Sequence, residues 1–520
     1  MNDSEIFATV QRRIKAQDFK GAEALLLKTM KERPEKTLWL NKLAEIYYRA
    51  NMFARAQEAA FISHNLNPQR EDTLHLLCAI TGASGDRKAQ MDWALKGVML
   101  NHRSFVAFNN LGSALFSMGM FAEALIPFET AVEINPALFE TKTNIGIIHH
   151  KLGQSDKAIE VFENLRRQVA SEKDLKSAIE FYLSLEYLAR GDIHNGWVCY
   201  EGGFSERIPP GSSRAPQRQF EARRWKGQSI KGKRLLVWRE QGVGDELMFM
   251  SCYGDLAKEG ATIIIECEPR LVTIFSKTFP DYEVRAYRHG PAPKYLSPVE
   301  DFDFQIPAGS LPRLYRNRIE DFPEIAPKLY IDPLRRDYFQ TLFGVERDQT
   351  LVGVCWRSGN VDPVRKKSYT DISDWEPLFR REGYRYVCLQ YDDCDEEIAL
   401  VRERYGVEII KLPGIDLKNN FIDVAALMSC LDVIVSVGTA VVPLAGAVGA
   451  PTYLLAEENT WTLLAADYPW FESVHPITVP FGDPMSAALA KLPYPMTIQN
   501  KNNSTIKADR RVELRAMQPS

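Results

Sequence analysis

Hydrophobic residues recur at helical spacing across the first third of the chain, and almost no segment there alternates between apolar and polar positions. Prolines mark a period of about 34 residues and lie at Pro34, Pro68 and Pro136. Segments beginning at Phe105 and Phe139 put small and large apolar residues in the same places of that period. The pattern predicts consecutive pairs of amphipathic helices, because each pair can bury its apolar faces against its neighbours.

These helical pairs resemble the tetratricopeptide repeat in the order of their small and large residues. The clearest repeat fills the signature positions with Leu111, Gly112, Gly119, Ala124, Phe128, Ala131 and Pro136. The resemblance implies an all-α superhelix over residues 1–204 that binds another polypeptide. We therefore expect the protein to act on, or through, a partner protein.

The pattern changes after residue 204. Residues 205–231 are rich in Arg, Pro, Ser and Gly, which is typical of a linker. Two blocks, 232–345 and 346–500, then alternate short buried-strand patterns with helical segments, which predicts parallel sheets with helices on both faces. Residues 501–520 form a polar tail. The chain is thus expected to be multidomain: the repeat superhelix, then an α/β region of two Rossmann-like domains that face a cleft.

The expected strands of the two blocks are short and rich in Val, Ile and Leu. They lie at 233–238, 262–266, 283–286, 303–306 and 310–314 in the first block and at 351–356, 386–390, 407–411, 433–436 and 452–455 in the second. Ligands of such sheets bind outside the carboxyl ends of the strands, so each strand-to-helix turn there is a candidate site.

The composition disfavours several classes of function. A formal net charge of −4 argues against a general nucleic-acid binder, which would carry a basic excess. No run of about 18 apolar residues predicts a membrane span, and the polar start of the chain has no signal-peptide pattern. The eight cysteines are scattered, without a C-x-x-C pair, and predict reduced thiols in a cytoplasmic protein. No cofactor and no metal ion is expected.

The turn after the first expected strand, residues 239–245, carries the best candidate for catalysis. Gly242 and Gly244 allow a ligand to approach the backbone closely, and the helix that follows favours an anionic group, so both are expected to contact a donor substrate. Asp245 at the mouth of the sheet suits a general base that deprotonates a hydroxyl group. The alternatives are a dinucleotide-binding loop or a plain tight turn. The neighbouring Glu246 is the second candidate for the base, although its place in the helix turns it elsewhere.

The second block supplies a basic loop. Arg357 follows its first strand, and Arg365, Lys366 and Lys367 lie in the loop beyond. Cations at the end of a strand are what a phosphate or diphosphate needs, which makes Arg357 and Lys367 candidate donor ligands. The alternative is a solvated charge run.

A second phosphate site is expected after the strand at 433–436. Ser436, Gly438, Thr439 and Ala440 stand between this strand and a helix of small residues. Thr439 is a candidate N-cap, and free amide groups at the helix start could hold a phosphate. Alternatively, the small residues are present only to pack the helix closely on the sheet.

One acidic signal is discounted. Asp393-Cys-Asp395 superficially matches the D-x-D metal motif of another class of sugar transferases. Acidic residues are, however, favoured in the first turn of a helix, which is the simpler explanation for this run.

Four segments in this order resemble the tetratricopeptide-repeat glycosyltransferase proteins of bacteria. They read EQGVGDELMF, DFDFQIPAGSLPRLY, VGVCWRSGN and DVAALMSCLDVIVSVGTAVVPLAGAVGAPTYLL. The catalytic region of those proteins is similar to the ADP-heptose:lipopolysaccharide heptosyltransferase family. The resemblance implies a GT-B fold, metal-independent inverting transfer, Asp245 as the base and a nucleotide-sugar donor held mainly by the second domain. It assigns the phosphate contacts to Arg357, Lys367, Ser436, Thr439 and Ala440.

The chain departs from the heptosyltransferase pattern at two positions. That family usually carries an Asp before the Thr and a His further along the helix, where this chain has Gly438 and Pro443. The departures favour a different sugar nucleotide or a lost activity.

Three functions are compatible with these features. The first is transfer of a sugar to Ser or Thr of an acceptor protein recruited by the repeats, with flagellin as a candidate acceptor by analogy with flagellin-modifying enzymes. The second is a repeat-based binding or assembly factor with a degenerate transferase domain. The third is transfer to a lipopolysaccharide sugar, which would leave a long peptide-binding array without a role.

Overall fold

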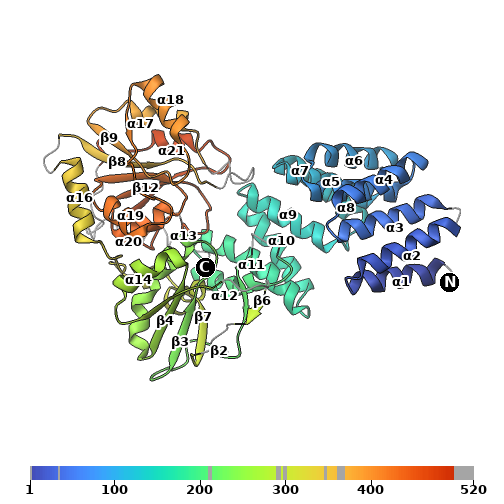
Figure 1. The fold of residues 1–520 in the computed structure, drawn as a ribbon, viewed down its shortest axis with the longest axis horizontal. Helices are drawn as coiled ribbons and strands as arrows, with labels where there is room; N and C mark the ends of the chain where they lie inside the picture. Colours follow the sequence, from blue (N-terminus) through green and yellow to red (C-terminus); the bar gives the residue numbers. More distant parts are fainter. Residues whose placement is uncertain are drawn as a thin grey trace. The chain divides into compact units, whose positions relative to one another are not determined.

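The computed structural model describes residues 3–32, 35–208, 213–288, 294–296, 301–344, 348–359, 369–465 and 467–496. The chain forms two compact units, Met1–Val161 and Phe162–Ser520. The first unit is helical, and the second combines helices with two large parallel sheets and a two-stranded one (Figure 1).

Antiparallel helices pair along the first unit, as the repeat pattern predicts. The helices are α1 (Asp3–Lys15), α2 (Phe19–Glu32), α3 (Lys36–Arg49), α4 (Phe53–Leu66), α5 (Glu71–Ser84), α6 (Arg87–Leu100), α7 (Phe105–Ser117), α8 (Phe121–Ile134), α9 (Phe139–Lys151) and α10 (Ser155–Gln168), the last of which runs into the second unit. Small residues let the helices cross closely: a Cβ on Gly112 would lie 2.7 Å from the Phe128 ring. The repeats predicted to begin at Phe105 and Phe139 coincide with α7 and α9.

Three helical segments begin the second unit beyond α10. They are α11 (Lys173–Ala189), α12 (Ile193–Tyr200) and the 3-10 turn η1 (Glu201–Phe204). Trp197 of α12 is fully buried and meets Trp470 and Trp461, with ring centroids 5.9 and 6.5 Å apart. These helices therefore share a core with the α/β region.

The first sheet has five strands in the order β2-β7-β3-β4-β5, and all neighbours are parallel. The strands are β2 (Arg223–Arg224), β3 (Arg234–Trp238), β4 (Thr262–Cys267), β5 (Glu283–Ala286) and β7 (Phe304–Pro307). The chain leaves β3 first toward β4 and later returns to its other side at β7. That reversal of direction between β3 and β7 is the point where ligands bind such sheets.

The second sheet has six parallel strands in the order β10-β9-β8-β11-β12-β13. The strands are β8 (Thr350–Cys355), β9 (Tyr384–Cys388), β10 (Ile409–Ile410), β11 (Val433–Val437), β12 (Thr452–Glu457) and β13 (Val474–Val479). In chain order this is the 3-2-1-4-5-6 arrangement of a doubly wound sheet, and its reversal lies between β8 and β11.

Helices cover both sheets. Around the first sheet these are α13 (Val243–Phe249), η2 (Met250–Glu259), η3 (Pro269–Leu271), α14 (Val272–Thr278), η4 (Ala308–Ser310), α15 (Pro312–Tyr315) and η5 (Ile319–Asp321). Around the second they are α16 (Pro333–Phe343), η7 (Ile372–Trp375), α17 (Glu376–Phe379), α18 (Asp395–Tyr405), α19 (Phe421–Met428), α20 (Val441–Val448) and α21 (Ser486–Ala490). No helix in the described ranges combines the length and the apolar character that a membrane crossing requires.

Parts of the fold differ from the sequence prediction. The expected linker, 205–231, contains β1 (Gln217–Gln219), which pairs with β6 (Lys294–Leu296), and also β2 of the first sheet. The expected strand at 310–314 is helical, because Pro312 suits a first helical turn and cannot donate to a strand ladder. Strand β13 was not predicted, since it contains Pro476, which a sheet tolerates at an edge.

Candidate functional site

The turn between β3 and α13 holds Asp245 in a fixed orientation. Gln241 adopts a left-handed backbone conformation with φ 58°, and α13 begins two residues later at Val243. The Asp245 carboxylate accepts a hydrogen bond of 3.0 Å from the backbone N–H of Gly242. The carboxylate is thus tied to the turn that precedes its own helix, and it is only half-buried.

A loop of the second sheet approaches this turn closely. A Cβ on Gly244 would lie 3.3 Å from Cα of Ala440 and 3.7 Å from Cγ of Pro443. Helices α13 and α20, which start at the carboxyl ends of β3 and β11, therefore meet at Gly244. Of the predicted donor ligands, Gly242, Gly244 and Ala440 are brought together here.

Two buried tyrosines, Tyr200 and Tyr468, lie near the Asp245 turn, a placement that the sequence pattern did not predict. The hydroxyl of Tyr200 accepts a hydrogen bond from the Gln241 side chain, and its ring lies 5.7 Å from that of Trp461. Burial and the nearby Asp245 carboxylate raise the pKa of both Tyr200 and Tyr468. Neutral phenol groups thus line one side of the turn.

The loop after β11 presents backbone at the reversal point of the second sheet. Ser436 is fully buried, and its hydroxyl donates to the Val437 carbonyl at 2.8 Å, which stabilises the start of the loop. The Thr439 hydroxyl accepts the N–H of Val441 at 3.3 Å, as expected of a residue that caps α20. Gly438 is exposed, and a Cβ placed on it would meet no atom within 4 Å. Ala440 is half-buried, so Gly438, Thr439 and Ala440 form the accessible part of the loop.

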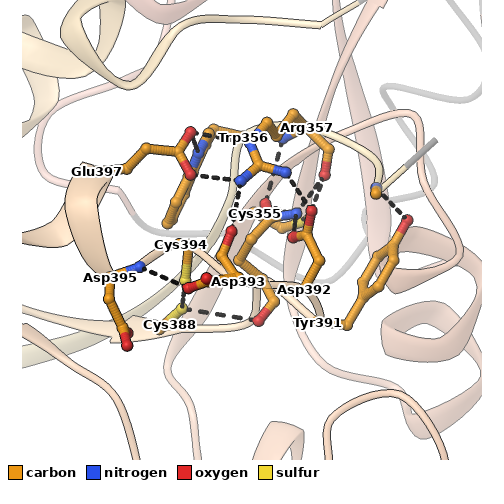
Figure 2. A network of polar contacts seen from close by, with 12 residues as sticks. Cys355, Trp356, Arg357, Cys388, Tyr391, Asp392, Asp393, Cys394, Asp395 and Glu397 are labelled. Carbon is orange, nitrogen blue, oxygen red and sulfur yellow. Dashed lines mark hydrogen bonds and ion pairs between the residues drawn. The ribbon is translucent and has the colours of Figure 1, made fainter. Parts of the chain in front are cut away.

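Arg357, in the loop after β8, is held by two carboxylates that follow β9: Asp392 in the loop and Glu397 in the first turn of α18 (Figure 2). Its Nε and Nη2 lie 2.8 and 2.5 Å from the two oxygens of Glu397, and Nη1 binds Asp392. Hydrogen bonds with Glu397 and Asp392 raise the pKa of Arg357 further above its usual value. The guanidinium is thus paired with two carboxylates of the protein, and the phosphate contact expected of it stays a prediction.

The acidic run that was discounted as a metal motif explains this pairing. Helix α18 begins at Asp395, as expected for acidic residues in a first turn. The same run also supplies Asp392 and Glu397, which hold Arg357. The sequence contains the opposite charges, but they meet only because β8 and β9 are neighbours in the sheet.

The loops after β8 and β11 lie side by side. The thiol of Cys355 and the hydroxyl of Thr439 are 3.6 Å apart. Tyr391 fixes the adjacent backbone, since its hydroxyl lies 2.9 Å from the Ser358 hydroxyl and accepts the N–H of Gly359 at 3.3 Å. The predicted donor ligand Lys367, with Arg365 and Lys366, lies outside the described residues.

At the reversal point of the first sheet, between β3 and β7, buried side chains of the protein itself occupy the space. Glu240, at the end of β3, accepts the N–H of Gly309 beyond β7 at 2.5 Å. The guanidinium of Arg214 binds the same carboxylate, and both side chains are fully buried. The Arg214–Glu240 pair thus occupies the point between β3 and β7, whereas the loop after β11 presents Gly438, which is exposed.

Glu246 is separated from this surface. It is 1% exposed, and its carboxylate lies 2.8 Å from Nε of Arg239 and accepts the backbone N–H of Glu268 at 2.9 Å. Burial raises its pKa to about 7, although Arg239 opposes the change. Asp245 is thus the more accessible of the two carboxylates considered for the base.

These features define the class of the protein. It is a helical repeat array followed by an α/β region in which two doubly wound parallel sheets meet at their carboxyl ends. The tetratricopeptide repeat model matches residues 106–138 and 139–165. Protein FlbA of Caulobacter vibrioides is 32% identical over 447 residues, which cover 83% of this chain and 74% of FlbA. The chain therefore belongs to the FlbA family.

Solved structures of repeat proteins are also similar to part of the chain. MamA is 21% identical, with a TM-score of 0.28, over 32% of this chain and 96% of MamA. A tetratricopeptide repeat protein from Parabacteroides merdae ATCC 43184 is 15% identical, with a TM-score of 0.34, over 40% of this chain and 80% of that protein.

Proposed function

We propose that this chain is a GT-B glycosyltransferase that transfers a sugar from a nucleotide-sugar donor to Ser or Thr of a protein recruited by the repeats. The close approach of Gly244 to Ala440 is the observation that carries the proposal. It puts the Asp245 turn beside the accessible loop at the reversal point of the second sheet. A base and a phosphate-binding loop are the two parts that such a transfer requires.

The reaction is a direct displacement. Asp245 takes the proton of the acceptor hydroxyl as its oxygen forms a bond to the anomeric carbon of the sugar. The bond between that carbon and the donor phosphate breaks, and the configuration of the sugar inverts. The leaving nucleotide carries away the electron pair, and the proton passes from Asp245 to solvent. Neither a metal ion nor a cofactor takes part in this scheme.

The donor phosphates are assigned to Gly438, Thr439 and Ala440. Their backbone borders the reversal point at the start of α20, where helix amides favour an anion. Two further observations support the assignment. Gly438 is exposed, with open space where a side chain would project. The corresponding point of the first sheet is occupied by Arg214 and Glu240.

The acceptor is assigned to the repeat array. Tetratricopeptide repeats imply a protein partner, and tethering a partner raises the effective concentration of its hydroxyl groups near the catalytic turn. Flagellin is the candidate acceptor, by analogy with repeat-containing enzymes that modify it, and the reaction is placed in the cytoplasm.

A second candidate function is a binding or assembly factor whose transferase region has lost its activity. One specific observation favours it: Glu397 and Asp392 neutralise Arg357, so this cation is not free for a phosphate. Gly438 and Pro443, at positions where the heptosyltransferase family carries Asp and His, point the same way.

Two measurements separate these candidates. Intact masses of proteins that co-purify with the chain are compared between strains that carry the wild-type protein, the Asp245→Asn variant or no such chain. Calorimetric titrations of the full chain with UDP-, GDP-, ADP- and CMP-sugars run in parallel. A sugar-sized mass increase that depends on Asp245 supports the transferase. A partner of unchanged mass, together with no binding of any donor, supports the assembly factor.

A further inference from the structure

Arg214 is bound at the reversal point of the first sheet much as a ligand would be. Its side chain is fully buried, and its Nε and Nη2 each lie 2.5 Å from an oxygen of Glu240. Nη2 also donates to the Ser310 hydroxyl at 2.9 Å, and Nη1 donates to the Tyr200 carbonyl at 3.2 Å. Burial disfavours the charge of Arg214, but the Glu240 carboxylate outweighs this and raises its pKa. The guanidinium thus meets its partners as a planar, bidentate fork.

Glu240 joins the ends of β3 and β7. Its carboxylate accepts the N–H of Gly309, where a Cβ would lie only 2.3 Å from the carboxylate oxygen. Because Glu240 is fully buried, losing Arg214 would leave an uncompensated charge inside the protein. The carboxylate is therefore held from two sides, by the Arg214 guanidinium and by the Gly309 N–H.

Four residues separate Glu240 from Asp245 in the chain, and hydrogen bonds anchor the first two of them, Gln241 and Gly242. The N–H of Gln241 donates to the Ala215 carbonyl at 2.5 Å, and its side chain binds the Tyr200 hydroxyl. Gln241 is held in the left-handed region, which a residue with a side chain rarely adopts without external support. The next residue, Gly242, donates its N–H to Asp245.

We propose that Arg214 is the positioning residue for Asp245. Its guanidinium fixes Glu240, and its own segment fixes Gln241, so the turn can present the Asp245 carboxylate in only one orientation. The proposal rests on the proposed function in one respect, namely that Asp245 is the base. Arg214 lies in residues 205–231, the expected linker, so this proposal gives that segment a role at the site.

Hydrogen exchange of the full-length protein tests the positioning directly, without requiring activity. Arg214→Ala should speed the exchange of backbone amides at 240–246 by about tenfold or more, because an anchored turn becomes free to open locally. Ethylguanidinium at millimolar concentration should slow the exchange again by refilling the vacated site. Arg316→Ala is the matched control, since Arg316 is also buried but binds the Ser251 carbonyl and Asp255. It should not change exchange at 240–246.

Two outcomes would overturn the proposal. One is wild-type exchange at 240–246 in the Arg214→Ala variant. The other is faster exchange spread evenly over Phe162–Ser520 that ethylguanidinium does not reverse. If the alanine variant fails to fold, Arg214→Lys replaces it, because lysine keeps the charge but loses the bidentate geometry. Faster exchange confined to 240–246 is then expected, and wild-type exchange would contradict the idea.

Transfer to the acceptor, followed by intact mass, provides the second arm. Arg214→Ala should lower kcat by about tenfold or more with KM for the donor unchanged, and ethylguanidinium should restore kcat. Asp245→Asn should not respond to ethylguanidinium. If the wild-type protein transfers nothing, the proposed function fails, while the exchange data still decide whether Arg214 holds the turn. If Arg214→Ala transfers at the wild-type rate, the proposed function stands and the positioning role is wrong.

Discussion

Single residues define the geometry around Asp245. Gly244 lets α13 and α20 approach closely, since a Cβ there would lie 3.3 Å from Cα of Ala440. Gly242 donates the hydrogen bond that orients the Asp245 carboxylate. Both glycines and the aspartate stand out in the sequence, but the buried partner of the turn, Arg214, does not. An arginine in a polar segment gives no sign of which carboxylate it will meet.

Replacing Asp245 with Asn should reduce transfer by roughly 10²–10⁴-fold, because the amide cannot accept the proton of the acceptor. The amide oxygen can still accept the N–H of Gly242, so the melting temperature should change little. Intact mass of the acceptor over time measures the rate. Transfer at the wild-type rate would remove Asp245 from the mechanism.

The two glycines at the meeting of the sheets should differ sharply when replaced by Ala. Gly244→Ala forces a Cβ to 3.3 Å from Cα of Ala440, and strain of this kind typically costs about 1–3 kcal/mol. Gly438→Ala projects into open space and should change stability by less than about 0.5 kcal/mol. Thermal unfolding of both variants provides the comparison. Equal melting temperatures would show that α13 and α20 do not meet so closely.

Glu246 should make stability depend on pH. Its pKa rises from 4.5 in the unfolded chain to about 7 when it is buried. Between these values the folded protein binds more protons than the unfolded one, so stability should fall as pH rises through this window. Glu246→Gln should remove that part of the pH dependence. Chemical denaturation at pH 5, 6 and 7 measures it, and an unchanged profile in the variant would rule out Glu246 as its source.

Among the elements, the strands that build the two sheets were largely predictable. Buried runs such as Leu235–Val237 and Ile263–Ile265 are continuous and apolar, as expected for strands covered on both faces. Of the two edge strands of the second sheet, β10 lies within the strand expected at 407–411, whereas β13, which contains Pro476, was not predicted. The ion pairs between loops were not predictable from local pattern, because Arg357 and Glu397 meet only once β8 and β9 have paired.

The loops after β8 and β9 provide a test of what Arg357 does. If it braces the loops, both Arg357→Ala and Glu397→Gln should weaken donor binding by a similar factor, about tenfold for a charge-assisted contact. Calorimetric titration with whichever nucleotide sugar binds the wild-type chain measures both variants. If Arg357 is a phosphate ligand that Glu397 restrains, Glu397→Gln should instead bind the donor more tightly. If the two substitutions change donor binding in opposite directions, Arg357 does not act by holding the two loops together.

For the whole molecule, the division between the units falls within α10 and not after η1. The sequence predicted a repeat region over residues 1–204 because α11 and α12 continue its helical pattern. Packing decides otherwise, since Trp197 is buried against Trp470 and Tyr200 binds Gln241. Such contacts between distant segments leave no local trace in a helical pattern.

Fragments of the chain test this division. A fragment of residues 155–520 keeps α11, α12 and their aromatic contacts, and it should unfold cooperatively and bind the donor as the full chain does. A fragment of residues 205–520 exposes Trp470 and loses Tyr200, so its melting temperature should be several degrees lower. Thermal unfolding and donor titration compare the two. Equal stability would show that α11 and α12 contribute little to the second unit.

The burial of Trp197 also decides where the recognition part of the protein could be exchanged for another. A chimera joined after η1 would bring foreign residues against Trp470 and Trp461, and a foreign segment against the turn that holds Asp245. A chimera joined near Val161 would keep all of these contacts and replace only the helices that precede residue 161 in the chain. Retargeting the protein to a new acceptor thus calls for a junction inside α10, and natural recombination between relatives would meet the same constraint.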